Sequence, residues 1–146
     1  MKSIDTNILI HSTPDIVWGV LMDFNSYPEW NPFITSIEGE ARKGATLKNT
    51  IRVNDKSAQV FKPTILELKP KKEFRWLGHL FVRGLFDGEH YFLIEQVGKT
   101  SVRLTHGEKF SGLLAGTLMK IIGENTKNGF EAMNKALKKR VEAINN

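Results

Sequence analysis

The last third of the chain has apolar residues at helical spacing. They recur through residues 111–144, and no proline interrupts this stretch. The pattern predicts one long helix that begins with Ser111 as its side-chain cap. About 32 residues at 1.5 Å each would span roughly 50 Å, which is longer than a domain of this size needs to fill its core.

Two apolar stripes run along this predicted helix. Its first half carries Leu114, Leu118, Ile121 and Ile122. Its second half carries a stripe rotated from the first by roughly 100°, which consists of Phe130, Met133, Leu137, Val141 and Ile144. Two buried faces are therefore expected.

Smaller residues continue the first stripe into the second half of the helix, at Asn125, Gly129, Ala132 and Ala136. A solid core needs large side chains at such positions. The pattern fits two interpretations. One is a helix with a wide apolar face and a bend at Gly123 or Gly129, and the other is a helix that forms one wall of a cavity.

The start of the chain combines one strand with two short helical segments. Residues 4–10 alternate between apolar and polar, which predicts a half-buried strand. Thr13-Pro14-Asp15 has the capping residue, proline and acid of a helix start. Residues 25–33 contain two prolines and predict a second short helix or turn that delivers Trp30 inward and gates an entrance.

From Phe33 to Phe110 the apolar residues alternate with a period of two, and turn sequences divide them into about six further strands. Pro63 requires a bulge or an edge in its strand. No helical segment intervenes, so the strands are expected to be antiparallel, with the first strand pairing at an edge. The predicted order is β-α-α-β6-α, an α+β fold in which a curved antiparallel sheet of about seven strands wraps around a long C-terminal helix.

Composition narrows the class of protein. The 146 residues suit a single domain, 1–146, and the absence of cysteine excludes disulfides and thiolate metal sites. The N-terminus lacks the apolar run of a signal peptide and no later run reaches membrane-spanning length, so a cytoplasmic protein is expected. The net charge of +5 comes from dispersed residues. Nucleic acid is not expected as a partner, because no basic stripe is interleaved with aromatic residues.

Three stretches resemble the START/SRPBCC superfamily, in particular its polyketide cyclase/dehydrase-like branch. They are residues 12–18 with 27–33 (STPDIVW and YPEWNPF), residues 85–92 (LFDGEHYF) and residues 104–112 (LTHGEKFSG). The resemblance extends over nearly the whole chain. It implies the helix-grip fold and a deep, largely apolar cavity between the sheet and the final helix. It implies no single function, because the superfamily includes lipid carriers, hormone receptors, cyclases and co-chaperones.

Strand alternation indicates which polar residues face the interior. On two strands joined by a short turn, His90, His106 and Glu108 share the side of the large apolar residues. Buried charges need partners. The three side chains therefore either satisfy one another, or bind the polar end of an apolar ligand, or transfer protons to and from a bound carbonyl compound. Two histidines alone make a weak metal site, so neither a metal nor a cofactor is expected.

The sequence thus predicts a protein that encloses a hydrophobic or amphipathic small molecule, such as a lipid or an aromatic polyketide-like compound. The alternatives are a cyclase/dehydrase-type enzyme that acts in the same cavity and a co-chaperone-like protein-interaction module. The expected ligand-binding residues are Trp30, Trp76, Phe86, His90, Phe92, Leu104, His106, Glu108, Phe110, Asn125, Gly129, Ala132 and Met133.

Overall fold

The computed structural model describes residues 2–54, 56–80 and 82–144; Met1, Asp55, Phe81, Asn145 and Asn146 of the expected domain lie outside these ranges. Within them the chain forms, in order, β1 (Lys2–Ile10), α1 (Pro14–Met22), the 3-10 turn η1 (Phe24–Ser26), α2 (Tyr27–Trp30), β2 (Ile34–Glu38), β3 (Lys48–Asn54), β4 (Ser57–Phe61), β5 (Thr64–Lys69), β6 (Glu73–Leu80), β7 (Phe86–Gly98), β8 (Ser101–Ser111) and α3 (Ala115–Ile144).

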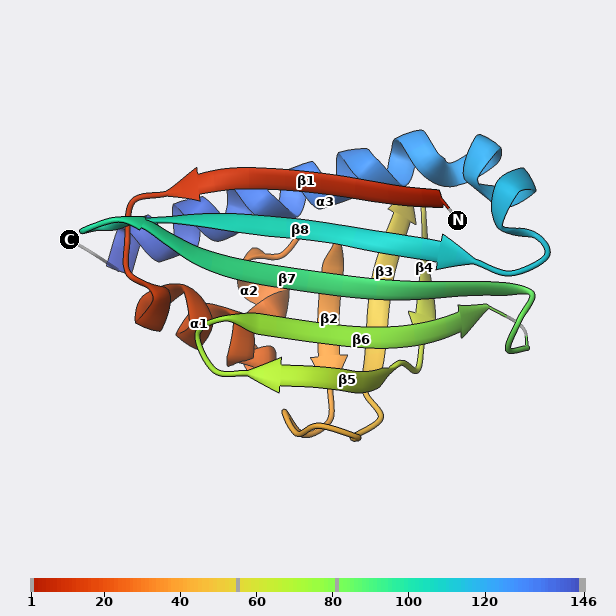
Figure 1. Cartoon of the computed structure of the whole chain (residues 1–146), viewed down its shortest axis with the longest axis horizontal. Coiled ribbons are helices and arrows are strands. Elements are labelled where there is room, and N and C mark those ends of the chain that lie inside the picture. The colour runs from red at the N-terminus through yellow and green to blue at the C-terminus, as the bar shows by residue number, and fades with distance from the viewer. Residues whose placement is uncertain (1, 55, 81, 145–146) are drawn as a thin grey trace.

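The strands form two hydrogen-bonded antiparallel groups that run across one another (Figure 1). The larger group has the order β1-β8-β7-β6-β5, and the smaller has the order β2-β3-β4. Backbone bonds join the two groups: Gly44 donates to Ile65 at 2.9 Å, and Leu47 donates to Pro63 at 2.8 Å. Together the groups make one curved sheet, and β1 pairs with β8 at its edge, as the sequence predicts.

The described residues contain one strand more than the sequence predicts, and Pro63 is the reason. The sequence indicates a single strand through residues 60–68 with a bulge or an edge at the proline. In the structure Lys62 and Pro63 lie between two strands that belong to different groups, β4 and β5. A proline cannot donate a ladder hydrogen bond, so it marks the position where the chain leaves one group for the other.

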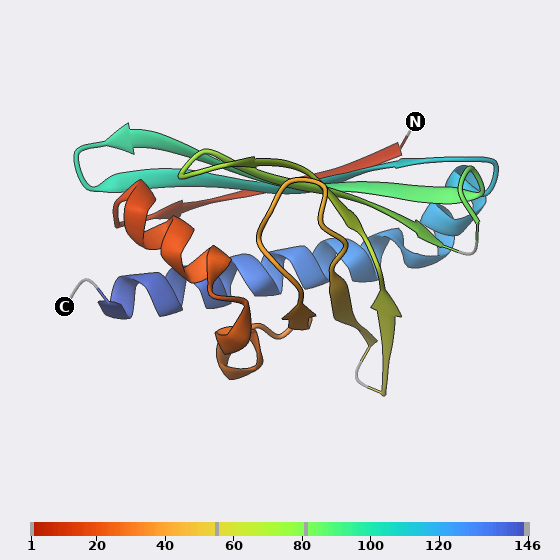
Figure 2. The same ribbon diagram turned by 90° about the horizontal axis from the view of Figure 1, so that it is seen from below.

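Helix α3 lies along the concave side of the larger group of strands (Figure 2). It begins at Ala115, so the prediction that Ser111 caps it is wrong. Ser111 still pairs with Asp87 in the strand ladder, and the chain then turns at Gly112, which has a φ of 109°. Of the described helices, including the 30 residues of α3, none combines the length and the apolar character that a membrane span needs.

The two halves of α3 differ in burial, so the expectation of two buried faces holds for the second stripe up to Val141 and is wrong for the first. In the second half Phe130, Met133, Leu137 and Val141 are fully buried. In the first half Ile121 is 70% exposed. The second half therefore anchors the helix to the sheet, whereas the first half extends over an open part of the molecule.

Gly129 makes room for a side chain of the protein itself. A Cβ added at this position would collide with the ring of Phe33. Phe33 in turn packs edge-on against Phe130, with 5.4 Å between the ring centroids. In the direction in which Gly129 lacks a side chain, the ring of Phe33 therefore fills the space that the sequence interpretation assigned to a ligand.

Gly129→Ala is expected to lower the free energy of unfolding by about 1–3 kcal/mol, because the added methyl group overpacks the contact with Phe33. Gly123→Ala, in the same helix, is the control. Its added Cβ meets only the end of the flexible Met119 side chain, at 3.4 Å, so it should stabilise the protein by roughly 0.5–1 kcal/mol. Urea unfolding of both variants measures the effects, and equal effects would contradict the packing of Phe33 against Gly129.

Candidate functional site

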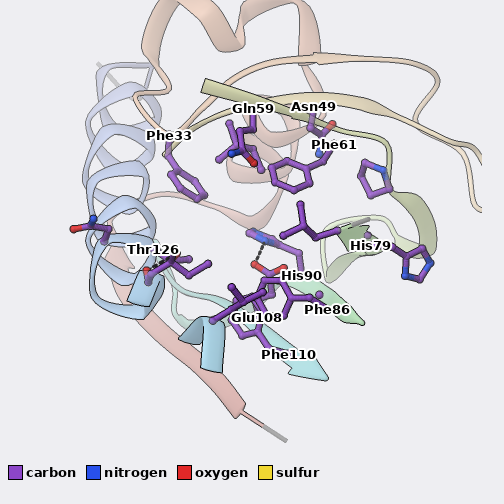
Figure 3. A pocket seen from close by; sticks show the side chains of 18 of the residues that line it. Phe33, Asn49, Gln59, Phe61, His79, Phe86, His90, Glu108, Phe110 and Thr126 are labelled. Atoms are coloured by element: carbon purple, nitrogen blue, oxygen red, sulfur yellow. Dashed lines mark hydrogen bonds and ion pairs between the residues drawn. The ribbon is translucent and has the colours of Figure 1, made fainter. Parts of the chain in front are cut away.

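A cavity of about 380 Å³ lies between the larger group of strands, the smaller group and the first half of α3. Aromatic and aliphatic side chains form most of its wall, and Figure 3 shows many of them around the open space. Six of the residues predicted to bind a ligand line it, namely Trp76, Phe86, His90, Glu108, Phe110 and Asn125. The sequence missed several residues from the smaller group of strands, including Asn49, Ile51 and Phe61.

The lining residues that are also exposed mark the mouth of this cavity. They come from β3, β4, β6 and α3, and are Asn54, Gln59, His79, Ile121, Ile122 and Asn125. The expected gate at residues 25–33 contributes only Phe33 to the lining, and Tyr27 within it is fully buried. The mouth therefore lies elsewhere, beside the exposed half of α3.

The other predicted residues lie outside the cavity wall. Five of them pack in or against the core, namely Trp30, Phe92, Leu104, His106 and Met133. Gly129 and Ala132 line a second hollow of about 300 Å³. Phe33, Asn54 and Asn125 line both hollows. Strand and helix periodicity identifies the inner face correctly, but it does not separate residues at the wall from those behind it.

From the cavity wall into the core, five side chains form a continuous hydrogen-bonded chain. Glu108 Oε1 lies 3.1 Å from His90 Nδ1, and His90 Nε2 lies 2.7 Å from His106 Nε2. His106 Nδ1 lies 2.8 Å from Asn134 Oδ1. The Asn134 amide donates to Thr6 Oγ1 at 2.9 Å, and Thr6 donates to the backbone carbonyl of His106 at 2.7 Å. Both histidines are at most 1% exposed, so their predicted inward orientation is confirmed.

The bonds from Asn134 to Thr6 and from Thr6 to the backbone carbonyl give this polar chain a direction. A backbone carbonyl only accepts hydrogen bonds, so the Thr6 hydroxyl donates its hydrogen to this carbonyl. The hydroxyl oxygen then accepts a hydrogen bond from the Asn134 side-chain nitrogen. The Asn134 oxygen then faces His106 and accepts the proton of Nδ1. The remaining nitrogen of a neutral His106 accepts, so His90 donates from Nε2 and accepts at Nδ1. The proton in that last contact therefore comes from Glu108.

The pKa values agree with this direction. Burial raises the pKa of Glu108 to about 8 and lowers the pKa of His90 to about 3. Burial, and then the neighbouring His90, hold the pKa of His106 well below its usual value. A neutral acid beside a neutral imidazole is therefore favoured over a carboxylate beside an imidazolium. Near pH 7 the polar chain ends in a carboxylic acid whose proton points at His90.

The second carboxyl oxygen of Glu108 is available to the cavity. The side chain lines the cavity and is 17% exposed, and among the described residues Oε2 has no hydrogen-bond partner. This oxygen lies over Gly88, where an added Cβ would collide with it. Because the proton is on the other oxygen, Oε2 presents lone pairs to the cavity and acts as a hydrogen-bond acceptor.

Thr6, Asn134 and Asn49 are site residues that the sequence interpretation missed. Each of them is a polar residue on the apolar face of its own strand or helix. Thr6 alternates with the inward isoleucines of β1, and Asn134 directly follows Met133 on the buried side of α3. A polar residue within an apolar stripe was the available signal. Among the described residues, no group of three His, Asp or Glu side chains is arranged so that it could hold a metal ion.

Residues 1–142 match the family described as polyketide cyclase / dehydrase and lipid transport. The match covers nearly the whole chain, and the chain belongs to this family. Among curated proteins, none matches the sequence.

Solved structures with the same fold include proteins of different activities. The Zhui aromatase/cyclase from Streptomyces sp. R1128 is 13% identical, with a TM-score of 0.79 over 97% of this chain and 93% of its own. A START superfamily protein from Mycobacterium smegmatis is 20% identical, with a TM-score of 0.74 over 97% and 98%. Norcoclaurine synthase from Thalictrum flavum is 15% identical, with a TM-score of 0.74 over 97% and 87%. At these identities the likeness establishes the helix-grip fold alone.

Nitrogen-15 NMR is expected to find one fixed tautomer for each buried histidine, with the proton on Nε2 of His90 and on Nδ1 of His106. Neither ring should gain a proton near neutral pH, because burial lowers the pKa of His90 to about 3 and holds the pKa of His106 well below its usual value. An imidazolium signal from His90 near neutral pH would contradict the direction of the polar chain.

Glu108→Gln is expected to gain stability relative to the wild type as the pH rises from 5 to 8. In the unfolded chain Glu108 loses its proton near 4.5, whereas in the folded protein its pKa is about 8. Between these values the folded state binds more protons, so wild-type stability falls by up to about 1.4 kcal/mol per pH unit. Glutamine does not titrate, and its amide can donate to His90 Nδ1. Urea unfolding measures the difference, and a constant difference would mean that Glu108 is ionised in the folded protein.

Proposed function

We propose that this protein binds or carries a hydrophobic or amphipathic small molecule, a lipid or an aromatic polyketide-like compound, in its internal cavity. Trp76, Phe86 and Phe110 supply the apolar contacts, and Glu108, held by His90, orients the polar end of the ligand. His106 acts indirectly, because it fixes the orientation and protonation of His90 from behind the wall.

The observation that carries this proposal is the cavity itself. A hollow of about 380 Å³ with mainly apolar walls and a few convergent polar groups has the size and character of a small-molecule site. A core packed to ordinary density would have closed such a space. The family, which includes lipid transport in its description, supports the same function.

A second candidate is an enzyme of the cyclase/dehydrase type that acts in the same cavity. The raised pKa of Glu108 favours it, because a carboxylic acid that keeps its proton near neutral pH is suited to proton transfer. Glu108→Gln separates the two candidates, since it retains shape and hydrogen bonding but cannot transfer a proton. A binding protein retains its ligand after this change, whereas an acid/base enzyme loses its turnover.

A protein-interaction module has less support. This alternative requires a filled cavity and an apolar surface patch, whereas here the cavity is open. Ile121 and Ile122 are exposed apolar residues of α3 and line the cavity mouth, so the entry of an apolar ligand accounts for their exposure.

Mass spectrometry of the purified protein, run first under native and then under denaturing conditions, is expected to show a small molecule that is released on unfolding. Gly78→Phe should abolish this copurification, because Gly78 lines the cavity and an added Cβ would contact only Pro63, at an ordinary 3.6 Å. Gly19→Phe, at an exposed position of α1 with open space beside it, is the matched control.

Binding of an apolar fluorescent probe gives the same test when no molecule copurifies. Gly78→Phe should weaken the affinity for the probe at least tenfold with little change in melting temperature, and Gly19→Phe should leave this affinity unchanged. Undiminished binding by a folded Gly78→Phe variant would place the ligand outside this cavity.

A further inference from the structure

Asn49 is a buried residue whose side-chain amide is unpaired within the part of the chain that the structure describes. It lies on β3, the central strand of the smaller group, with Ile37 and Phe61 opposite it on the neighbouring strands. Its side chain lines the cavity and is 0% exposed. Neither its amide nitrogen nor its amide oxygen has a hydrogen-bond partner within the described chain. A buried amide with both groups unpaired is destabilising, so this position requires an explanation.

The other buried polar group at the cavity wall is the Glu108–His90 pair. It belongs to the larger group of strands, so the two polar points face the cavity from different walls. Figure 3 shows Asn49 beside Phe61 on one side, and Glu108 beside Phe86 and Phe110 on another. The other polar residues of the lining are not buried groups in need of a partner. Thr126 donates to the backbone of α3, and the rest are exposed at the mouth, namely Asn54, Gln59, His79 and Asn125.

Glu108 and Asn49 require different hydrogen-bonding groups from a ligand. Glu108 Oε2 only accepts, because the polar chain behind it places the proton on Oε1. Asn49 both donates and accepts. A ligand that satisfies both points carries an O–H or N–H donor at one end. At the other end it carries a group that donates and accepts together, such as a carboxamide or a hydroxyl beside a carbonyl.

We infer that the cavity selects a neutral molecule with a polar group at each end and an apolar, ring-sized body between them, and that Asn49 and Glu108 determine this specificity. Carboxylates are disfavoured at both points. They offer no donor to Glu108 Oε2, and they leave the Asn49 oxygen facing another oxygen. The inference rests on the proposed function and narrows its ligand to hydroxylated neutral compounds, away from fatty carboxylates.

Four probes test this inference by titration calorimetry with the protein of residues 1–146. The first is a hydroxynaphthamide with its hydroxyl and carboxamide at opposite ends of the two rings. The second is its methyl ether, which cannot donate at that end, and the third is the corresponding hydroxynaphthoate. The fourth is naphthalene itself, which reports the apolar cavity alone.

The wild type is expected to bind the hydroxynaphthamide at least about tenfold more tightly than each of the other three probes. Asn49→Leu should remove the preference for the amide over naphthalene, and Asn7→Leu, at an exposed position of β1, should leave it intact. Glu108→Leu should remove the preference for the hydroxyl over the methyl ether. Glu108→Gln, unlike Glu108→Leu, should retain that preference, because the glutamine nitrogen donates to His90 and the glutamine oxygen still accepts a hydrogen bond from the ligand.

A melting curve of Asn49→Leu without any probe supplies an independent readout. Its melting temperature should exceed that of the wild type, because the change removes an unpaired buried amide. A lower melting temperature would show that Asn49 has a structural role, and would overturn the inference.

The outcomes distinguish this inference from the proposed function. If naphthalene binds but the amide and hydroxyl add nothing, or if Asn49→Leu leaves the preference unchanged, two-ended recognition is wrong and the apolar carrier stands. If Gly78→Phe leaves the binding of all four probes unchanged, or if none of them binds, both proposals fail.

Discussion

The hydrogen bond between the two imidazole rings of His90 and His106 is the contact on which the site depends. It joins β7 to β8, and the bonds on either side of it extend the connection to β1 and to the buried half of α3. Because both rings are buried and neutral, each nitrogen has one defined role as donor or acceptor. The backbone carbonyl at one end of this network therefore fixes the direction of the hydrogen bonds as far as Glu108, while burial keeps Glu108 protonated.

Much of the fold can be predicted from periodicity, because burial imposes the same alternation on every strand of a half-buried sheet. The edge position of β1, the long final helix and the inward orientation of His90 and His106 follow from it. Pro63 shows what periodicity alone does not predict. A proline interrupts a strand in several possible ways, and the sequence alone does not show that the chain passes there from one group of strands to another.

The candidate site is harder to predict, because it depends on contacts between residues that are distant in the sequence. Small residues on α3 suggested an opening, but the size of a residue does not reveal that Phe33 reaches across to Gly129. For Asn49 the position can be predicted but the contacts cannot. Its inward position is readable from alternation, yet only the packed structure shows that no described residue pairs with its side chain.

The carbonyl at the end of the polar chain has a consequence for proton conduction. A hydrogen-bonded wire passes a proton only if every member can afterwards reverse its donor and acceptor roles. The His106 carbonyl cannot donate, so the chain cannot reverse beyond Thr6. The interior of this protein is therefore a dead end for protons, and any proton that Glu108 gains or loses must enter or leave through the cavity.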